Sequence, residues 1–579
     1  MLQTYLKNHF ILWLIGLTAL AVLVRFPYLS QFPPAMLPDE AALGFNAISI
    51  AETGKDEWGI SWPLQFHSFG DDKPPAYVYA TALVYTVIGW TPALPRVTSA
   101  LSGVLIVVVL TLWLRQITKS DAGALIGGLI AAVSPWTVHL SRSALESNLG
   151  LLFFILGLYF LRKTKGNGQK RAISVSSGLA TLGFVLSAYS FHSYRLAAPL
   201  YLGILSLIEI VSLWKKRVNI RSYMQKPVLW ITVLAGLFIM PGLLIGGSTT
   251  RFSQTTLLQP TLVNSTMALN RDTCHEMSIQ MQIPYLSRAC QVIWNPITVS
   301  ANILFRSFLQ HLLPTFIFVS GDPGFARNPT QAGLLFAYLL PAFVIGLYQV
   351  YRRFHRYYFL IIGYLVAIIP SALTGPTHST RLSPLIPFVI AICVLGLIAI
   401  LKKKTYLYLL VAVSLLLAGG LFLVNYAQVT FGRSSDFVGH SRQLSLVIDK
   451  YAANGATVYV DPHALPEPHM YLAFWNQIAP QEYQSMQKFL DPNQLIAERP
   501  VQLGSSIFFE EPGFARLICD PKLKQAVVFI SPEELHFKPN LIVTNNTRSN
   551  SAAFVYEMQS MRLQPGPLFE MCGAGISFK

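Results

Sequence analysis

The chain has 579 residues, of which 53% are hydrophobic and 12% are charged. This composition excludes an ordinary soluble domain and indicates a polytopic membrane protein. The formal net charge of +16 does not indicate nucleic-acid binding, because the cations stand in short clusters between apolar runs, as they do in the cytoplasmic loops of membrane proteins.

Apolar runs along the first three quarters of the chain predict about eleven membrane-spanning helices. The first run would also suit a signal peptide, but no small-residue cleavage site follows it. We therefore predict an uncleaved helix whose flank, residues 25–28, anchors at the membrane interface. The predicted spans lie near 10–24, 96–114, 121–139, 148–161, 173–190, 196–213, 227–245, 333–350, 357–373, 383–401 and 405–424.

One further apolar run, residues 76–90, is excluded from the spans because of the charges that follow it. With this run outside the bilayer core, the Lys and Arg clusters of the later loops all fall on the cytoplasmic side, as the positive-inside rule requires. If the run crossed, every later loop would invert. Its tyrosines and Trp90 suit the headgroup region, so we predict an interfacial or re-entrant helix.

The same topology, with a cytoplasmic N-terminus, places the C-terminal region and five polar sites on the outer face. The first outer loop covers 25–95. A long outer loop covers 246–332, and we expect a surface helix within 291–318. The other three sites are short segments at helix mouths, namely 141–146, 191–195 and 377–381.

The composition changes after Tyr426. Residues 427–579 lose the long apolar runs and show a helical stretch at 436–451 followed by short strand-like segments, which predicts an extracytoplasmic α/β domain. We therefore divide the chain into a membrane domain, 1–426, and a C-terminal domain, 427–579. The strand-like segments are 456–460, 526–530, 541–544 and 553–556.

Four of the five cysteines lie outside the membrane in this topology, where disulfides can form. Cys274–Cys290 and Cys519–Cys572 are plausible pairs, but four cysteines allow three connectivities and the sequence does not choose among them. Cys393 lies within a predicted span and is expected to be a plain apolar residue.

The first outer loop carries the strongest chemical signal, because seven of the 27 acidic residues of the chain lie in it. Asp39 and Glu40 follow a proline and begin an apolar-periodic run that ends at Gly54. They are expected to open a helix, where a carboxylate satisfies free N–H groups and is also well held for general-base catalysis. Lys73 lies between Asp72 and two prolines, which suits either a surface ion pair or a stiffly held phosphate ligand.

Further charged residues lie at the outer mouths of the spans. Arg142 and Glu146 have the i, i+4 spacing of a local salt bridge on a helix. Two histidines and two arginines are each interface residues by default, but together they supply enough cations to bind a phosphate ester. They are His192, Arg195, His378 and Arg381. No His or Cys cluster has zinc spacing and no nucleotide-binding motif is present, so we expect no bound metal.

The first loop contains Pro38-Asp39-Glu40, then Gly54 to Gly59, then Gly70 to Tyr77 with Asp71-Asp72-Lys73-Pro74-Pro75 inside it. This order resembles the bacterial relatives of the protein O-mannosyltransferases, a group that includes the lipid A aminoarabinose transferases. Arg96, Arg142 with Glu146, and Gly321-Asp322 fit the resemblance as well. It covers about 1–425 and is weak in the C-terminal domain.

The resemblance implies a GT-C fold, a polyprenyl-phosphate sugar as donor and inversion at the anomeric carbon. It implies that Asp39 is the catalytic base with Glu40 in support, and that Glu146 belongs to the second acidic motif. It also implies that Lys73 holds the lipid phosphate and that Asp72 orients Lys73. Aminoarabinose transferases carry a polar pair with an arginine after the acidic pair. This chain has Ala41-Ala42 there, which argues against the same acceptor chemistry.

The chemistry of such a transfer sets the residue types. The acceptor hydroxyl must lose a proton as it attacks C1 of the sugar, so a carboxylate must lie within hydrogen-bond reach. The leaving lipid phosphate gains charge and needs lysine or arginine. Because this leaving group is already good, no metal cofactor is required. The predicted function is sugar transfer from a membrane lipid carrier to a hydroxyl of a protein, lipid or glycan at the outer face of the cell membrane.

The main alternative is a transporter or flippase of lipid-linked sugars. Such proteins carry ionisable residues or broken helices at mid-membrane and repeated halves, which this sequence lacks. A receptor or scaffold with an outer sensor domain would leave Asp39 and Lys73 unexplained. The sugar, the acceptor, the lipid length and the oligomeric state stay open.

Overall fold

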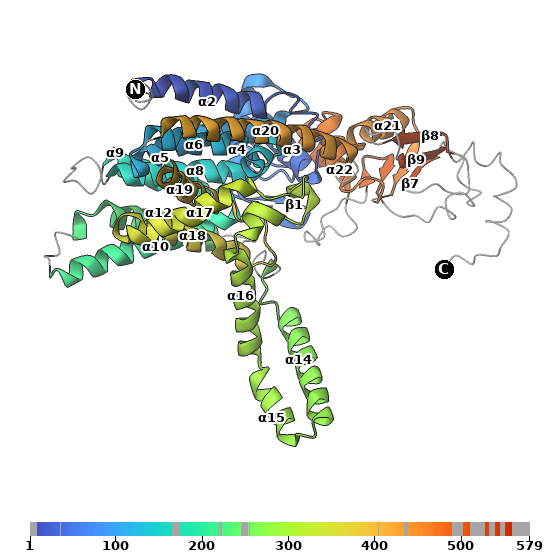
Figure 1. Cartoon of the computed structure of the whole chain (residues 1–579). Helices are drawn as coiled ribbons and strands as arrows, with labels where there is room; N and C mark the ends of the chain where they lie inside the picture. Colours follow the sequence, from blue (N-terminus) through green and yellow to red (C-terminus); the bar gives the residue numbers. More distant parts are fainter. Residues whose placement is uncertain are drawn as a thin grey trace. The chain divides into compact units, whose positions relative to one another are not determined.

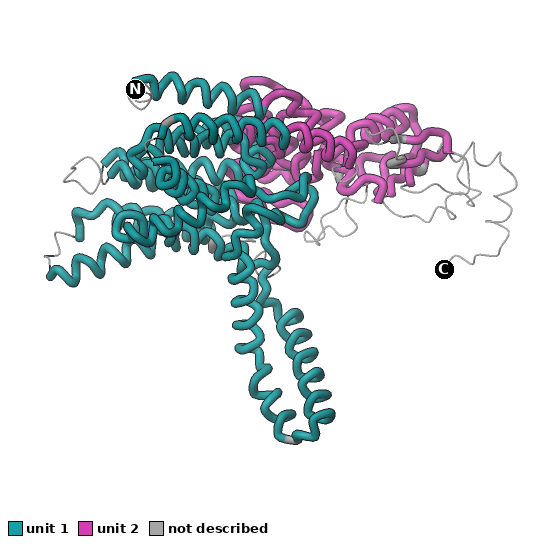
Figure 2. Tube along the Cα trace, in the orientation of Figure 1, with its two compact units in different colours: residues 1–25, 101–141, 146–422 teal, residues 26–100, 142–145, 423–579 magenta. Residues whose placement is uncertain are grey.

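The computed structural model of the chain describes residues 8–34, 36–164, 174–217, 219, 223–244, 253, 255–402, 404–433, 438–461, 463–488, 502–509, 527–531, 539–544 and 551–557. The chain forms two compact units (Figure 2). Unit 1 consists of residues 1–25, 101–141 and 146–422, and unit 2 of residues 26–100, 142–145 and 423–579. The first outer loop thus groups with the C-terminal region, whereas we expected it in the membrane domain.

Unit 1 is built of apolar helices, and every predicted span coincides with a helix (Figure 1). The segment predicted at 121–139 is two helices, α6 and α7. α5 begins in unit 2, and α20 ends there. The bounds are α2 (Phe10–Arg25), α5 (Leu94–Thr118), α6 (Asp121–Val133), α7 (Pro135–Arg142), α8 (Glu146–Thr164), α9 (Val175–Ala188), α10 (His192–Lys215), α12 (Pro227–Leu244), η3 (Ala337–Leu339), α17 (Leu340–Arg352), α18 (Phe354–Ala372), η4 (Ser383–Leu385), α19 (Ile386–Leu401) and α20 (Thr405–Gly432).

The described helices make this a multi-pass membrane protein. Five of them are long and apolar enough to cross a membrane, namely α5, α10, α18, η4 with α19, and α20. The pair α6–α7 is a sixth if it counts as one span despite a bend of 51°. Shorter apolar helices are α2, α9, α12 and α4 (Ala76–Ile88). With 13 residues, α4 is roughly 20 Å long, less than the ~30 Å of a hydrocarbon core, but α9 and α17 are about as short, so its exclusion from the spans stays a prediction.

Close backbone contact holds α19 against α17. A Cβ atom on Gly346 of α17 would lie 1.9 Å from the carbonyl oxygen of Ile392, and one on Gly396 of α19 would lie 1.8 Å from that of Ala342. In lipid no hydrophobic force drives helices together, so small residues that permit close packing hold them instead. A larger side chain at either glycine would push the two helices apart.

The bend between α6 and α7 is held by Arg25. Pro135 opens α7 and cannot donate a backbone hydrogen bond, so the last carbonyls of α6 need other donors. The guanidinium of Arg25 donates to the carbonyl oxygens of Ala131 and Ala132, at 3.0 and 2.9 Å, and to Ser141 Oγ at 3.1 Å. We expected Arg25 at the membrane interface, but it is fully buried and satisfies a broken helix.

The long outer loop contains a helical arm. Helix α14 (Pro260–Gln280) runs outward, and α15 (Pro284–Ile293) with α16 (Pro296–Leu312) returns beside it (Figure 1). The disulfide Cys274–Cys290 joins α14 to α15 and confirms that predicted pair. The second predicted pair, Cys519–Cys572, lies outside the described residues. Helix α16 is the expected surface helix and packs on α18. The π-turn η1 (Phe316–Ser320) and the 3₁₀ turn η2 (Phe325–Arg327) follow.

The first loop contributes two helices and a hairpin to unit 2. Helix α3 (Pro38–Thr53) begins at the predicted acidic pair and ends at Gly54, whose φ of 70° is left-handed. The strands β1 (Phe66–Ser68) and β2 (Asp71–Lys73) pair antiparallel through the two-residue turn Phe69-Gly70, in which both φ values are positive. Such turns match the twist of the strands and fix their register. Helix α4 then packs against α3.

The C-terminal part of unit 2 is a seven-stranded mixed sheet with helices. Its order is β4-β5-β6-β3-β7-β9-β8, in which β3 is parallel to β6 and β7 and the other pairs are antiparallel. The four predicted strands and the predicted helix are all present. The bounds are α21 (Ser441–Ala453), β3 (Thr457–Val460), α22 (Pro468–Trp475), α23 (Pro480–Met486), β4 (Gln487–Lys488), β5 (Gln502–Leu503), β6 (Ile507–Phe508), β7 (Val527–Ser531), β8 (Leu541–Thr544) and β9 (Ser551–Glu557).

One hydrophobic core joins the first loop to this sheet. Phe45 of α3, Val458 of β3 and Phe474 of α22 belong to the same buried cluster. A Cβ atom on Gly44 would lie 2.6 Å from the ring of Phe474, so α3 and α22 pack closely. The Tyr471 hydroxyl donates to the carbonyl oxygen of Met36 at 2.6 Å. The first loop therefore buries its apolar side against the C-terminal region and folds with it.

Candidate active site

An ion pair joins the two motifs of the first loop. The Nζ atom of Lys73 lies 2.5 Å from Oδ1 of Asp39. The lysine side chain is 5% exposed, whereas the aspartate side chain is 67% exposed. A buried cation is thus held against a carboxylate that is open to solvent. These are the two residues to which the resemblance assigns the phosphate ligand and the base.

Local structure fixes both partners of this pair. Asp39 lies in the first turn of α3, where the free N–H groups and the helix dipole favour a carboxylate. Lys73 is the last residue of β2, and Pro74 and Pro75 restrict the backbone after it. Its Nζ also lies 5.4 Å from the centre of the Phe69 ring. Both charges are therefore presented from stiff elements, which lowers the cost of arranging them around a substrate.

Glu40 has a different role from its neighbour Asp39. Arg96 donates to both of its oxygens, from Nε at 2.9 Å and from Nη2 at 2.8 Å. The backbone N–H groups of Leu37 and Ala144 donate to the same carboxylate, at 3.0 and 2.7 Å. Glu40 and Arg96 are almost fully buried. We expected Glu40 to assist in proton transfer, but its oxygens are already occupied and it braces the start of α3.

Glu57 is a buried acid for which we predicted no role. It accepts hydrogen bonds from Nδ2 of Asn46, at 3.0 Å, and from the Ser68 hydroxyl. Burial raises the pKa of Glu57 to about 7, although these two hydrogen bonds and the charge of Lys73 each lower it. Near neutral pH this carboxyl therefore changes charge close to the Asp39–Lys73 pair. Burial causes the shift, and burial at one position of a loop has no sequence signature.

Asp72 pairs with a histidine of the same hairpin. Its Oδ1 lies 2.7 Å from Nδ1 of His67, on the facing strand of the hairpin. Successive side chains of a strand point to opposite faces, so Asp72 and Lys73 are directed apart. Lys73 itself is paired with Asp39, and an orienting role for Asp72 stays a prediction.

Arg142 and Glu146 do not share a helix, because α7 ends at Arg142 and α8 begins at Glu146. The predicted i, i+4 geometry therefore does not apply. Arg142 is buried in unit 2 and donates to the carbonyl oxygens of Pro27 and Phe32, at 2.9 and 3.1 Å. Glu146 opens α8 in unit 1, where an acid complements the helix dipole.

Several of the other predicted outer sites meet within unit 1. The hydroxyl of Tyr194, near the start of α10, lies 2.9 Å from Ser383 Oγ and 3.3 Å from the carbonyl oxygen of Ser147. Tyr194 is fully buried. The starts of α8 and α10 and the turn η4 therefore converge on this one side chain.

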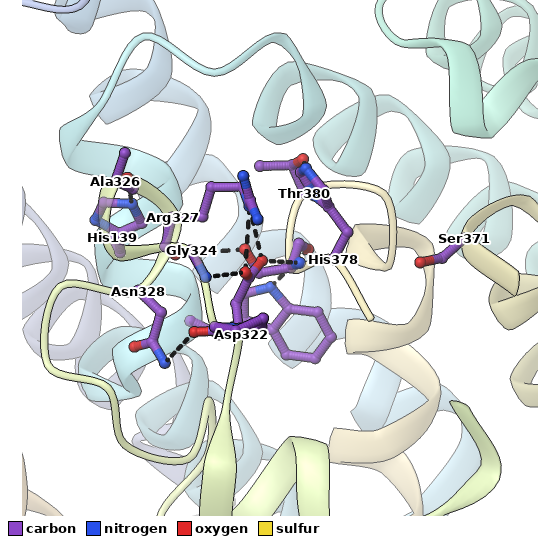
Figure 3. Close-up of polar contacts among 12 residues, drawn as sticks. His139, Asp322, Gly324, Ala326, Arg327, Asn328, Ser371, His378 and Thr380 are labelled. Atoms are coloured by element: carbon purple, nitrogen blue, oxygen red, sulfur yellow. Dashed lines mark hydrogen bonds and ion pairs between the residues drawn. The ribbon is translucent and has the colours of Figure 1, made fainter. Parts of the chain in front are cut away.

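Asp322 forms the centre of a second network in unit 1 (Figure 3). Its carboxylate accepts from the backbone N–H groups of Ser379 and Gly324, at 2.6 and 2.8 Å, and from Nε of Arg327 at 3.1 Å. Burial raises the pKa of Asp322, but Arg327 and the two N–H groups outweigh burial and hold the pKa below its ordinary value. The network ties the long outer loop to the segment 377–381.

Two side chains of α7 reach the same segments. The indole N–H of Trp136 donates to the carbonyl oxygen of Ser379 at 3.0 Å. The Nε2 atom of His139 lies 3.0 Å from the carbonyl oxygen of Ala326 (Figure 3). The sequence singled out neither Trp136 nor His139. It noted Asp322 but did not pair it with Arg327. The turn signature Gly321 to Gly324 followed by an arginine is the signal that could have indicated this network.

The two predicted histidines of unit 1 lie at helix mouths. His378 places its Nδ1 2.9 Å from Thr380 Oγ1, beside the Asp322 network (Figure 3). His192 is the first residue of α10, and its ring lies 6.4 Å from that of Phe191. Their positions agree with the predicted segments, and a role in substrate binding stays a prediction for both.

The two predicted arginines of unit 1 donate to nearby groups. Arg195 is buried, and its Nε donates to the carbonyl oxygen of Ala188 at 3.2 Å. Arg381 is half-buried and donates from Nη1 to the carbonyl oxygen and the hydroxyl of Thr374, at 3.0 and 2.9 Å. These contacts fix the outer ends of the helices. Within the described part of the chain, no group of three or more His, Cys, Asp or Glu could hold a metal ion.

Unit 2 also contains a cavity of about 540 Å³ between the first loop and α21 and α22. Arg96 and Arg442 line it, and the guanidinium of Arg442 lies 5.6 Å from the centre of the Trp475 ring. Hydroxyl and amide groups and aromatic rings share its walls, among them Ser30, Gln31, Phe32, Gln443 and Trp475. Such a mixture of rings and polar groups suits a polar organic ligand of the size of a sugar.

Known structures give a likeness along almost the whole chain. The crystal structure of ArnT from Cupriavidus metallidurans bound to undecaprenyl phosphate is 12% identical, with a TM-score of 0.50 over 94% of this chain and 98% of that one. This is a GT-C fold. The apo form of the same ArnT gives 13% identity, a TM-score of 0.49 and the same coverage. The Archaeoglobus fulgidus oligosaccharyltransferase, in complex with Zn and sulfate, gives 12% identity, a TM-score of 0.47, and coverage of 80% of this chain and 61% of that one.

No family model and no curated protein matches the sequence. The GT-C fold is therefore visible in the three-dimensional arrangement and in the short motifs of the first loop, but not in overall sequence similarity. It agrees with the fold that these motifs led us to expect.

Proposed function

We propose that this chain is an inverting glycosyltransferase that moves a sugar from a polyprenyl-phosphate carrier to an acceptor hydroxyl at the outer face of the membrane. The Asp39–Lys73 pair is the observation that carries the proposal. It holds an exposed carboxylate and a buried ammonium 2.5 Å apart, so a base and a phosphate ligand lie within reach of one reacting bond. The undecaprenyl phosphate bound to ArnT, which shares the GT-C fold, supports a lipid-phosphate donor.

The two charges have complementary roles in the proposed reaction. The arriving lipid phosphate replaces the Asp39 carboxylate as the partner of Lys73, which stabilises the charge that grows on the leaving group. Asp39 is thereby freed to take the proton of the acceptor hydroxyl. The bond from the hydroxyl oxygen to C1 forms while the bond from C1 to the phosphate oxygen breaks, so the anomeric configuration inverts. Lys73 supplies the charge stabilisation for which other enzymes use a metal.

Supporting residues hold this pair without taking part in bond changes. Glu40 and Arg96 fix the start of α3, from which Asp39 projects. The cavity lined by Arg96, Arg442 and Trp475 is in the same unit and has the lining expected of an acceptor site. The acceptor class, whether protein, lipid or glycan, follows from neither feature. For Arg195 and Arg381 of unit 1, phosphate binding stays a prediction.

The test is transfer by the purified full-length chain in lipid nanodiscs, with a panel of polyprenyl-phosphate sugars and metal-chelated buffer. We expect Asp39→Asn to keep donor binding but to lower turnover by about 10²–10⁴-fold, because an amide cannot accept the proton. Lys73→Ala should weaken donor binding and turnover together, because Lys73 meets phosphate in the ground state and in the transition state.

Glu52→Gln is the matched control, since it removes a charge from the same helix at an exposed position that hydrogen-bonds only Tyr85 in the described chain. It should leave transfer unchanged. Full activity in folded Asp39→Asn would remove Asp39 from the mechanism and leave Glu146 as the next candidate. A flippase would move labelled lipid between leaflets without forming a glycoside, and its rate would not respond to the loss of a base.

A further inference from the structure

Unit 1 contains a second charged cavity, at the opposite end of its helices from the polar sites already described. Its volume is about 240 Å³, and it lies among the ends of α5 and α8, the middle of α10 and the start of α18. Helix α8 begins at Glu146 and reaches this cavity at Arg162. The positive-inside rule predicts that this end of the bundle is cytoplasmic, because exposed cations such as Lys163 and Arg353 surround it.

The cavity gathers positive charge without a carboxylate in its wall. Arg162, His355 and Arg356 line it, and the charges of the two arginines repel each other. The acid that acts on this region, Glu209, is already paired with Lys226, at 2.8 Å. Among the described residues, Arg162 makes no hydrogen bond and no ion pair; its guanidinium lies 5.3 Å from the centre of the Phe359 ring. Two close arginines without a counter-ion favour the binding of an anion.

Buried hydrogen-bond donors line the same cavity. Tyr201 is 2% exposed and Trp113 is 1% exposed. Within the described part of the chain, neither the Tyr201 hydroxyl nor the Trp113 indole N–H makes a hydrogen bond. A ligand rich in acceptor oxygens would accept hydrogen bonds from these two donors. Leu158, Leu161 and Leu205 provide an apolar wall beside these donors.

We infer that this cavity binds a phosphate group, and that an anionic phospholipid of the adjacent leaflet supplies it. Phosphate oxygens accept from Arg162, Arg356 and Tyr201, while the acyl chains of the lipid continue along the leucine wall. Basic cavities between membrane helices at a cytoplasmic surface recognise anionic headgroups in this way. Soluble inorganic phosphate has the same acceptor chemistry but has no use for the apolar wall. The inference rests on unit 1 alone and is independent of the proposed transfer reaction.

The experiment measures lipid binding to the delipidated, full-length protein in detergent. Phosphatidylglycerol, phosphatidylcholine and inorganic phosphate are added in separate arms, and binding is followed by native mass spectrometry and by the midpoint of thermal unfolding. We expect phosphatidylglycerol to give one tightly bound lipid and a higher midpoint, with little effect of phosphatidylcholine. The double variant Arg162→Gln/Arg356→Gln should weaken that binding by about tenfold or more, because charge-assisted hydrogen bonds are lost.

Matched variants distinguish lipid binding in the cavity from lipid binding to general surface charge. Arg352→Gln/Arg353→Gln removes the same charge from exposed positions at the same end of the bundle that do not line the cavity, and it should bind phosphatidylglycerol as the wild type does. Tyr201→Phe removes one oxygen without a change of charge and should weaken binding several-fold. If the double glutamine variant does not fold, Tyr201→Phe and Arg162→Lys carry the test, since lysine lacks the fork of arginine.

Each outcome decides the inference. Selective phosphatidylglycerol binding that is lost in the cavity variants and kept in the surface variants supports it. A rise of the midpoint with inorganic phosphate alone, lost in the same cavity variants, supports a phosphate site and assigns it to a soluble anion. Equal binding of phosphatidylglycerol and phosphatidylcholine, or equal losses in the surface and cavity variants, would overturn it.

Discussion

Asp39 and Glu40, which are adjacent at the start of α3, have opposite surroundings. A motif can mark such residues as candidates but cannot assign a role to each. Asp39 is open to solvent against Lys73, whereas Glu40 is buried against Arg96. Neighbouring positions on a helix point about 100° apart, so one can face a site while the other faces the core. The motif marked both as catalytic candidates. It could not separate them, because the burial of Glu40 depends on contacts with residues 96 and 144, far along the chain.

Glu57 gives a test at the same scale. Its pKa is raised from 4.5 to about 7 in the folded protein, so the folded state keeps a proton that the unfolded state loses in this range. Glu57 therefore contributes about 3 kcal/mol to the free energy of unfolding below pH 4.5, and this contribution is lost as the pH rises to 7. Between pH 5 and pH 8 the midpoint of thermal unfolding should fall, and Glu57→Gln, which stays neutral, should flatten this fall. An unchanged pH profile in Glu57→Gln would show that other groups cause the dependence.

At the scale of elements, the sequence pattern predicted helices and strands but missed features that depend on contacts with distant residues. Long apolar runs predicted every described helix that is long and apolar enough to cross a membrane, and short strand-like segments predicted strands β3, β7, β8 and β9. Strands β4, β5 and β6 were not predicted, because a strand of two residues carries no periodic signal. The bend at Pro135 was read as one continuous span, although a proline inside an apolar run marks a helix boundary. The role of Arg25 was missed because its carbonyl partners lie more than 100 positions away.

The topology around α4 is a prediction about an element. Single cysteines at positions 92 and 118 are labelled with a membrane-impermeant maleimide in intact and in opened cells. We expect position 92 to react from outside and position 118 only after the cytoplasmic side is opened, because the charge pattern predicts that α4 does not cross and that α5 does. Labelling of position 118 in intact cells would invert every later loop and overturn the assignment of the outer sites.

At the scale of the whole molecule, the division of the chain differs from its change in composition. Tyr426 marks the end of the apolar runs, and we placed the domain boundary there. Contacts instead join residues 26–100 to 423–579 through a shared core. An apolar face on a predicted helix shows that another segment packs against it, but the sequence does not identify that segment. The GT-C fold could therefore be expected from motifs of the first loop, whereas the role of the C-terminal region in folding that loop could not.

Truncation tests this shared core. A chain that ends at Gly432 keeps Asp39 and Lys73 but loses α22 and the sheet that cover α3. Its first loop should become sensitive to limited proteolysis, and transfer activity should be lost with it, because Phe45 and its neighbours are exposed to water. Phe474→Ala in the full chain is the point control and should destabilise unit 2 by about 3–5 kcal/mol. A truncated chain with a protected first loop and full activity would show that the two parts fold separately.

The Asp39–Lys73 pair also has a consequence for how a reaction cycle would end. After transfer, the spent carrier would still sit on Lys73, and Asp39 would hold the proton taken from the acceptor. A neutral carboxyl competes poorly for an ammonium group, so the carrier is retained until that proton leaves. The restored carboxylate then displaces the carrier and closes the internal pair again. In such a cycle the internal pair would re-form once the proton of Asp39 has left.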